Sequence, residues 1–255
     1  CFGNDWVSIG IFTACIIFPV SILVDGSLTK IERDRIFVIY IIAFFVIFFW
    51  AAYEQAGASL TLFAAEQTDR TIFGWEMPAS WIQSFNPFFV VILAAIMPSV
   101  WGALNKRGME PASPTKQAIG LLLLSLGYLV ICFGVKDVQP GVKVSLIWLT
   151  GLYFIHTMGE IALSPIGLSM VNKLTPVRFA SLMMGIWYLS TSTANKFAGT
   201  LGGLYPEDGK VKTLLGFRIE TMFDFFMVFV IMSGVASLIL FLLSKKLQKM
   251  MHGVE

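Results

Sequence analysis

The chain has 255 residues, of which 56% are hydrophobic and 13% are charged, and its formal net charge is +2. Apolar runs recur along its whole length, which is typical of a protein with many membrane spans rather than of a soluble domain. The charges lie mostly between these runs and form no basic patch, so a nucleic-acid partner is not indicated. The three cysteines form no CxxC pair and the two histidines lie far apart, so neither a disulfide framework nor a metal site is expected.

Seven apolar stretches are long enough for a transmembrane helix, which needs roughly 20 residues. They cover residues 6–24, 36–63, 81–104, 117–134, 144–172, 178–203 and 220–243. The segments between them contain turn-forming residues, such as Gly26 within 25–27 and the Pro-Gly pair at 140–141. The sequence therefore predicts an all-α polytopic membrane protein with about seven transmembrane helices in a lipid bilayer.

Lysine and arginine are concentrated in alternate segments between the predicted spans. The richer set consists of Lys30, Arg33, Arg35, Lys106, Arg107, Lys116, Lys173, Arg178, Lys245, Lys246 and Lys249. The positive-inside tendency places these segments and the C-terminus in the cytoplasm, and the N-terminus outside. The chain begins at Cys1, and residues 1–24 lack the basic region of a signal peptide, so we expect a fragment of a longer protein.

Glu160 is the most informative residue of the fifth apolar stretch. An acid in a membrane helix costs about 2.5–3.5 kcal/mol on insertion scales, so it normally faces a cavity, a partner charge or a substrate. His156, Glu160 and Ser164 recur every four residues and predict one polar stripe. Alternatively, Glu160 is a structural acid paired with Lys196 or with a hydroxyl group. We expect His156 to be a hydrogen-bonded packing residue, with a proton relay as the alternative.

Two other stretches contain polar groups at membrane depth. Trp50 and Glu54 are four residues apart, which places them on one helix face. Asn86 precedes Pro87 near the start of the third stretch, where a proline frees a backbone carbonyl and the resulting break usually lines protein or a cavity. Glu54 fits a gating pair or a structural pair equally well, and Asn86 could instead cap a helix.

The sixth stretch carries Trp187 and Lys196. Trp187 could form the wall of a pocket, although a tryptophan at such a position, like Trp50, also serves as a packing or interface residue. Lys196 could neutralise an acid, extend its charged end outward, or meet Asp224. The sequence alone leaves these alternatives open.

Four segments together resemble the C-terminal half of the proton-coupled oligopeptide transporter (POT) family of the major facilitator superfamily. They are FWxxxEQ at 49–55, QSxNP at 83–87, GEIxxSPxGLS at 159–169 and MGxW at 184–187. Their order is that of the family's seventh, eighth, tenth and eleventh helices, and the resemblance extends over about residues 28–249. It implies an extra linker helix in residues 1–27 and a six-helix C-terminal bundle with an inverted 3+3 repeat in residues 28–255.

The resemblance also implies roles for single residues. Glu160 and Asn86 would bind the amino terminus of a di- or tripeptide, and Trp50 and Trp187 would border a side-chain pocket, with Ser164 beside it. Glu54 would form a gating salt bridge to an arginine on the family's first helix, which lies outside this chain. Lys196 and His156 are further candidates for gating or proton coupling.

The function implied is proton-coupled symport of di- and tripeptides across a bacterial cytoplasmic membrane. An absent N-terminal six-helix half would complete the transporter and carry the principal proton site, and no cofactor is expected besides the coupling proton. The alternatives are a major facilitator half for another small substrate and a seven-helix receptor or structural membrane subunit.

A membrane serine protease is a further alternative, because Ser59 and His156 lie on different predicted helices and could form a dyad. However, Leu60 occupies the position where a glycine is expected after such a serine, and no oxyanion-hole segment is evident. Acids on broken membrane helices favour a transporter instead, so we expect no enzymatic activity.

Overall fold

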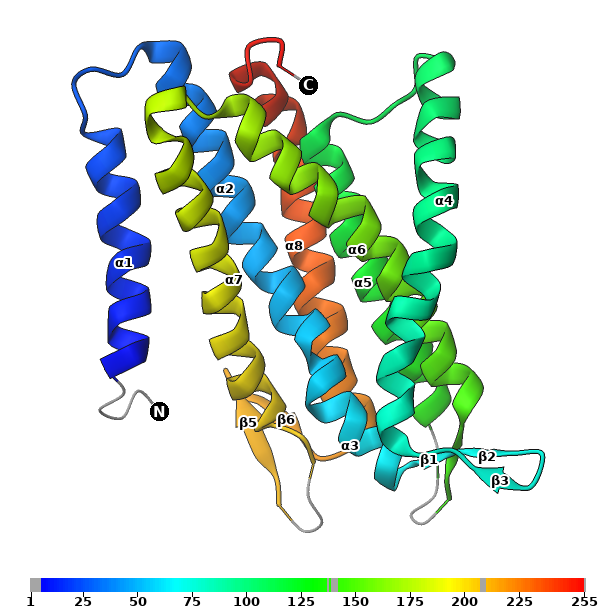
Figure 1. Cartoon of the computed structure of the whole chain (residues 1–255). Coiled ribbons are helices and arrows are strands. Elements are labelled where there is room, and N and C mark those ends of the chain that lie inside the picture. Colours follow the sequence, from blue (N-terminus) through cyan, green and yellow to red (C-terminus); the bar gives the residue numbers. More distant parts are fainter. Residues whose placement is uncertain (1–5, 137, 139–141, 207–209, 255) are drawn as a thin grey trace.

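The structure, a computed structural model, describes residues 6–136, 138, 142–206 and 210–254. Within these residues, seven long helices lie side by side and are connected alternately at the two ends of the molecule (Figure 1). They are α1 (Trp6–Leu23), α2 (Lys30–Tyr53), α4 (Phe85–Lys106), α5 (Ser113–Val135), α6 (Leu146–Leu174), α7 (Ala180–Gly202) and α8 (Met222–Met250). The prediction of an all-α bundle is confirmed.

Six helical segments in the described part of the chain are long and apolar enough to cross a membrane. The exception among the seven predicted spans is α7, which has 23 residues but carries a run of hydroxyl and amide side chains near residues 190–195. Helix α7 nevertheless packs along α1 and α2. Helix α7 is therefore part of the bundle, although its hydropathy alone does not identify it as a membrane span.

Helices α2 and α8 extend beyond the apolar stretches that predicted them. Helix α2 begins at Lys30, where Thr29 and Glu32 form a capping box: the Glu32 amide donates to Thr29 Oγ1 at 3.3 Å, and the Thr29 amide donates to the Glu32 carboxylate at 2.8 Å. Helix α8 continues past three lysines to Met250. Hydropathy detects only the apolar part of a helix, so it misses the polar residues with which α2 begins and α8 ends.

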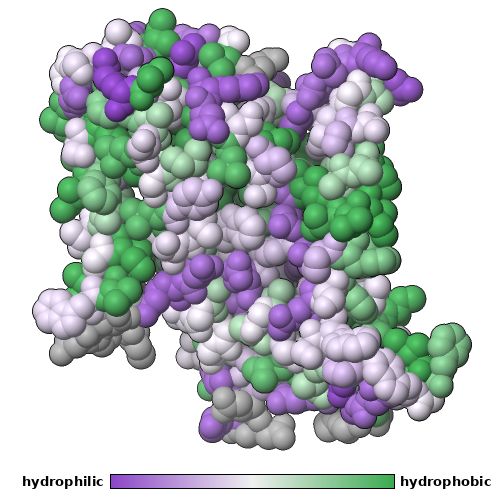
Figure 2. All heavy atoms as spheres, viewed as in Figure 1, coloured by the Kyte–Doolittle hydropathy of each residue, from purple (hydrophilic) through white to green (hydrophobic). Residues whose placement is uncertain are grey.

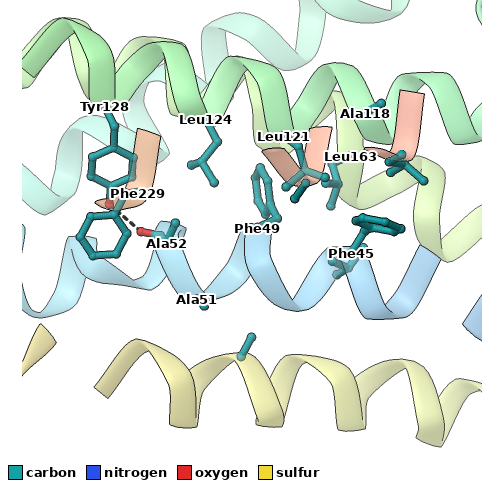
Figure 3. Close-up of a cluster of buried hydrophobic side chains, with 14 of the residues drawn as sticks. Phe45, Phe49, Ala51, Ala52, Ala118, Leu121, Leu124, Tyr128, Leu163 and Phe229 are labelled. Carbon is teal, nitrogen blue, oxygen red and sulfur yellow. Dashed lines mark hydrogen bonds between the residues drawn. The ribbon is translucent and has the colours of Figure 1, made fainter. Parts of the chain in front are cut away.

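The predicted span 36–63 is divided in the structure. Helix α2 ends at Tyr53, a 3₁₀-helix, η1, covers Glu54–Gly57, and α3 covers Ser59–Glu66. Next to this break, the Tyr128 hydroxyl donates to the Ala52 carbonyl at 2.6 Å (Figure 3). A side chain of α5 thus supplies a hydrogen bond where the α-helical pattern of α2 ends.

The core lies where α2, α5, α6 and α8 meet. Figure 3 shows Phe45 and Phe49 of α2 beside Leu121 of α5 and Leu163 of α6, all of them buried. Helix α5 packs against α6 and α8 along its length, whereas α1 and α4 stand at the two edges of the bundle (Figure 1). Helix α5 is therefore the element around which the others are arranged.

Three glycines at seven-residue spacing, Gly120, Gly127 and Gly134, bring α5 close to α6. A Cβ atom added at any of the three would lie 2.3–2.9 Å from a side-chain atom of α6. At Gly127 that atom is Cδ2 of His156. Small residues repeated along one face let membrane helices approach closely, so the packing of α6 depends on the absence of side chains here.

Short strands and 3₁₀-helices complete the connections. The strand pairs lie at the end of the bundle opposite the C-terminus (Figure 1). Strand β1 (Thr68–Asp69) pairs in parallel with β4 (Val144–Ser145), and the hairpins pair β2 (Thr71–Ile72) with β3 (Trp75–Glu76) and β5 (Lys212–Leu214) with β6 (Phe217–Ile219). The 3₁₀-helices η2 (Ala79–Ser84) and η3 (Val177–Phe179) precede α4 and α7.

Replacing Gly127 by Ala should destabilise the folded protein by about 1–3 kcal/mol, because the new methyl group overlaps the His156 ring. The thermal unfolding midpoint of the full-length protein in detergent measures the change. Gly102→Ala is the matched control, since a Cβ there has open space within 4 Å. Equal unfolding midpoints for the two variants would contradict the close α5–α6 contact.

Candidate functional site

Glu160 lies at the centre of a hydrogen-bonded cluster in the middle of α6. The Tyr53 hydroxyl donates to Glu160 Oε2 at 2.5 Å, and Asn86 Nδ2 donates to the same oxygen at 3.0 Å. Asn86 Nδ2 also contacts Thr157 Oγ1 at 3.2 Å and donates to the Tyr53 hydroxyl oxygen. We call Tyr53, Asn86, Thr157 and Glu160 the acid cluster. The structure thus brings together Glu160 and Asn86, as predicted.

The cluster forms where two helices begin or end. Tyr53 is the last residue of α2, and Asn86 is the second residue of α4. The N-cap of α4 is Ser84, and the Asn86 amide extends to α2 and α6, so the alternative that Asn86 caps a helix is wrong. Pro87 is the third residue of α4, where a helix can accommodate the missing N–H, so Pro87 does not interrupt α4.

The two donors leave one oxygen of Glu160 available. Both bind Oε2, and no residue in the described part of the chain donates to Oε1. The side chain is half-buried and has no ion-pair partner among the described residues, so the alternative that it pairs with Lys196 is wrong. A carboxylate with one oxygen held and the other open can accept a hydrogen bond from a cationic group.

Glu54 and Trp50 lie beside the cluster. Helix α2 ends at Tyr53, but the Glu54 amide still donates to the Trp50 carbonyl, so the two residues are one helical turn apart, as predicted. Glu54 is the first residue of η1, is exposed, and interacts electrostatically with Glu160. The half-buried indole of Trp50 meets the Tyr53 ring edge to face, with 5.3 Å between the ring centroids. An acid and an aromatic wall thus adjoin the acid cluster.

Gln55 anchors the break in α2 and was not predicted. Its side chain is fully buried, and Nε2 donates to the carbonyls of Ala198 on α7 at 2.9 Å and of Ala51 at 3.2 Å. Its Oε1 accepts a hydrogen bond from Ser59 at 2.6 Å. Ser59 therefore binds Gln55 and not His156, so the serine–histidine dyad does not form.

His156 binds α5 through Nε2, and its ring also lies beside that of Tyr53, with 6.2 Å between the ring centroids. Its Nε2 lies 3.1 Å from the Leu124 carbonyl, and its ring centroid lies 4.7 Å from that of Tyr128. The prediction of one polar stripe with Glu160 and Ser164 is wrong in this respect, because the polar atom Nε2 of His156 is directed to a backbone carbonyl of α5 and makes no described hydrogen bond to Glu160. These contacts fit the predicted packing role of a buried histidine.

Trp187 lies in a notch between α6 and α7. It is buried, and a Cβ atom at Gly167 would lie 2.5 Å from its Cζ2 atom. Ser164 is half-buried on α6, about one turn beyond Glu160. The structure therefore places Trp187 against the turn of α6 that follows Ser164, and no described hydrogen bond joins it to the acid cluster.

Lys196 is exposed on α7, and the alternative that it meets Asp224 does not hold, because no ion pair joins these two residues in the described structure. Asp224 instead accepts hydrogen bonds from the amide and the hydroxyl of Thr221, at 2.9 and 2.8 Å, and caps α8. A carboxylate three residues after a threonine at a helix start is the signal that distinguishes a cap from a membrane ion pair.

Tyr53 and Thr157 are members of the cluster that were not singled out from the sequence. A tyrosine hydroxyl at membrane depth needs a hydrogen-bond partner, and Tyr53 directly precedes the acid Glu54, which is a usable signal. Thr157 lies three residues before Glu160 and so shares its helix face. The partner of Tyr53 is on another helix, however, and no spacing in the sequence indicates which one.

The cluster lies outside two hollows in the described part of the chain. Cavities of 630 and 930 Å³ are found near opposite ends of the bundle, lined in part by Lys116 and Lys173 in the first and by Glu66 and Tyr205 in the second. Figure 2 shows hydrophilic and neutral side chains across the middle of one face, with hydrophobic ones gathered over α4. Polar groups at mid-height are typical of a helical bundle that lines a membrane pathway.

The fold and the cluster define a helical membrane bundle of the secondary-transporter type, with a broken helix and a half-buried acid in the middle of another helix. Comparison with known sequences is specific: the profile of the POT family matches residues 8–215. The chain therefore belongs to the POT family, which confirms the resemblance of its four segments.

Named relatives support the same assignment. The chain is 37% identical to the peptide transporter YePEPT of Yersinia enterocolitica over 185 residues, which are 72% of this chain and 36% of that protein. It is 32% identical to the uncharacterized transporter YclF of Bacillus subtilis over 98% of this chain and 48% of that protein. Dipeptide and tripeptide permease A of Escherichia coli is 30% identical over 86% of this chain and 43% of the permease. The chain thus spans less than half the length of these relatives.

Solved structures show the same fold. A mutant of the peptide transporter POT in complex with alafosfalin superimposes with a TM-score of 0.84 at 29% identity, over 98% of this chain and 49% of that one. A POT family transporter in complex with 5-aminolevulinic acid gives 0.80 at 26% identity, over 96% and 49%. The predicted major facilitator bundle is confirmed.

Replacing Gln55 by Leu should destabilise the protein by about 1–3 kcal/mol, because the buried Ala198 carbonyl and the Ser59 hydroxyl lose their partner. Ser59→Ala removes only one donor to Gln55 and should cost about 1 kcal/mol. Thermal unfolding of the full-length variants measures both changes. A Gln55→Leu variant as stable as the parent would show that this side chain does not hold α2 to α7.

Proposed function

We propose that this chain supplies the C-terminal half of a transporter that carries di- and tripeptides across a membrane together with protons. Residues 28–255 form the six-helix C-terminal bundle, and residues 1–27 form the linker helix that precedes it. An N-terminal six-helix half would complete the pathway. The length of the relatives, which is at least twice the matched segment, supports a second half of similar size.

The observation that carries the proposal is the open Oε1 atom of Glu160. A peptide enters as a zwitterion, and its ammonium group loses hydration in a low-dielectric site unless a fixed anion replaces the lost water. Oε1 of Glu160 can accept from that ammonium while Tyr53 and Asn86 hold Oε2. Trp50 and Trp187 would border the peptide side chains, with Ser164 nearby, and aromatic walls accept side chains of varied shape.

Glu54 is the proposed gating acid. It is exposed at the break in α2, and no ion-pair partner for it lies within the described residues. An arginine of the N-terminal half would pair with it in one state of the transporter. Protonation of Glu54 would break that pair and shift the balance between outward-open and inward-open states. Lys196 and His156 remain further candidates for coupling.

The proposed setting is the cytoplasmic membrane of a bacterium. The loops richer in lysine and arginine, including the one with Lys106 and Arg107, lie at the same end as the C-terminus (Figure 1). The positive-inside tendency would place this end in the cytoplasm. Coupling to the proton gradient across such a membrane needs no cofactor besides the proton.

Glu160→Gln should weaken dipeptide binding by about 10- to 100-fold, because the side chain keeps its size but loses the charge that binds the ammonium. Binding and proton-driven uptake by the full-length protein in proteoliposomes measure the effect. Glu76→Gln, on an exposed hairpin far from the cluster, is the control and should transport normally. Undiminished affinity in the Glu160 variant would contradict the assigned site.

Gly167→Ala should change the preference among peptides, because the new methyl group lies 2.5 Å from Cζ2 of Trp187 and displaces the indole. Peptides with bulky side chains should lose affinity relative to dialanine, by severalfold. Gly185→Ala on α7 is the control, since a Cβ there meets nothing within 4 Å. A uniform loss for all peptides would show that Trp187 serves packing rather than specificity.

A further inference from the structure

We propose that Tyr53 is a positioning residue that fixes the Glu160 carboxylate and thereby determines selectivity for ligands with a free ammonium group. This inference rests on the proposed function, because it concerns the same substrate site. The Tyr53 hydroxyl group forms a hydrogen bond that joins α2 to α6. The role of that group differs from that of Asn86, which belongs to α4.

The Tyr53 ring has little freedom to move. It is stacked on Phe49, with centroids 5.4 Å apart and planes at 18°, and Trp50 packs edge to face against it at 5.3 Å. Phe49 is fully buried in the core between α2, α5 and α6 (Figure 3). The direction of the hydroxyl is therefore set by the core through the end of α2, and not by Glu160.

The hydroxyl acts as both donor and acceptor. It donates to Glu160 Oε2 at 2.5 Å and accepts a hydrogen bond from Asn86 Nδ2. A hydroxyl has one proton and two lone pairs, so it can hold the carboxylate and the amide together. Asn86 alone cannot fix the carboxylate, because its two amide protons are shared among Glu160, Thr157 and Tyr53.

Tyr53 differs from the other titratable neighbours of Glu160. Glu54 carries a like charge, and His156 is turned towards the Leu124 carbonyl. The Tyr153 hydroxyl is buried but has no hydrogen-bond partner in the described structure. Tyr53 is thus the titratable group that donates to the carboxylate. Without this bond, Glu160 can rotate, and Oε1 no longer points consistently towards the ligand.

The test measures the affinities of the full-length protein for a dipeptide and for its des-amino analogue, in which hydrogen replaces the N-terminal ammonium. Tyr53→Phe keeps the ring and removes the bond to a charged group, so it should weaken dipeptide binding at least about tenfold. Affinity for the analogue should stay unchanged, because that ligand makes no use of Oε1. The ratio of the two affinities should therefore fall about tenfold.

Two further variants make the result specific. Tyr153→Phe removes a tyrosine oxygen that makes no described hydrogen bond and should leave both affinities unchanged. In a Glu160→Gln background, Tyr53→Phe should have a much smaller effect on the dipeptide, since coupled residues are not additive. Unfolding midpoints of all variants show whether the fold is retained.

The outcomes separate the inference from the function it rests on. Parental dipeptide affinity in Tyr53→Phe, an equal loss for both ligands, or the same loss in the Glu160→Gln background would overturn the positioning role. Dipeptide binding that is insensitive to Glu160→Gln would instead overturn the proposed function of Glu160. A loss confined to the dipeptide that depends on Glu160 is the result expected.

Discussion

A carboxylate within an apolar membrane helix has to be held by donors, and the arrangement around Glu160 satisfies this requirement with neutral groups. Tyr53 and Asn86 come from the end of one helix and the start of another, so the two donors depend on where α2 ends and α4 begins. Uninterrupted membrane helices would make all their backbone hydrogen bonds, but they would not place the Tyr53 and Asn86 side chains against Glu160. The end of α2 and the start of α4 thus provide the two hydrogen-bond donors of the site.

Helix α5 contacts both the helix that carries Glu160 and the helix that ends at Tyr53. Its glycines admit α6 at close range, and the His156 ring fills the space beside Gly127. On another side, the hydroxyl of Tyr128 binds the Ala52 carbonyl just before α2 ends. Helix α5 therefore positions both the helix that carries Glu160 and the helix that carries Tyr53. A substitution that changes the α5 contacts would therefore move residues of the acid cluster, even though α5 contributes no residue to it.

The two sides of the acid cluster differ in chemistry. One oxygen of Glu160 is bound by the protein, whereas the other is open on a half-buried side chain. Glu54 lies exposed beside it, so two acids adjoin without a basic partner from the described residues. Such an arrangement is suited to cations from outside the chain: a substrate ammonium at Glu160 and, in the proposed transporter, an arginine of the other half at Glu54.

Hydropathy and motif order in the sequence determined the helical membrane class, the approximate spans and the family, and they predicted that Glu160 and Asn86 belong to one site. These features are local or depend on order along the chain. The sequence did not reveal the break at Glu54, the caps of α2 and α8, or the direction of His156. Only the tertiary structure decided that Tyr53 meets Glu160 and that Trp187 fits beside Gly167. Such contacts join residues far apart in the chain, and the relative placement of packed helices, rather than local spacing, determines them.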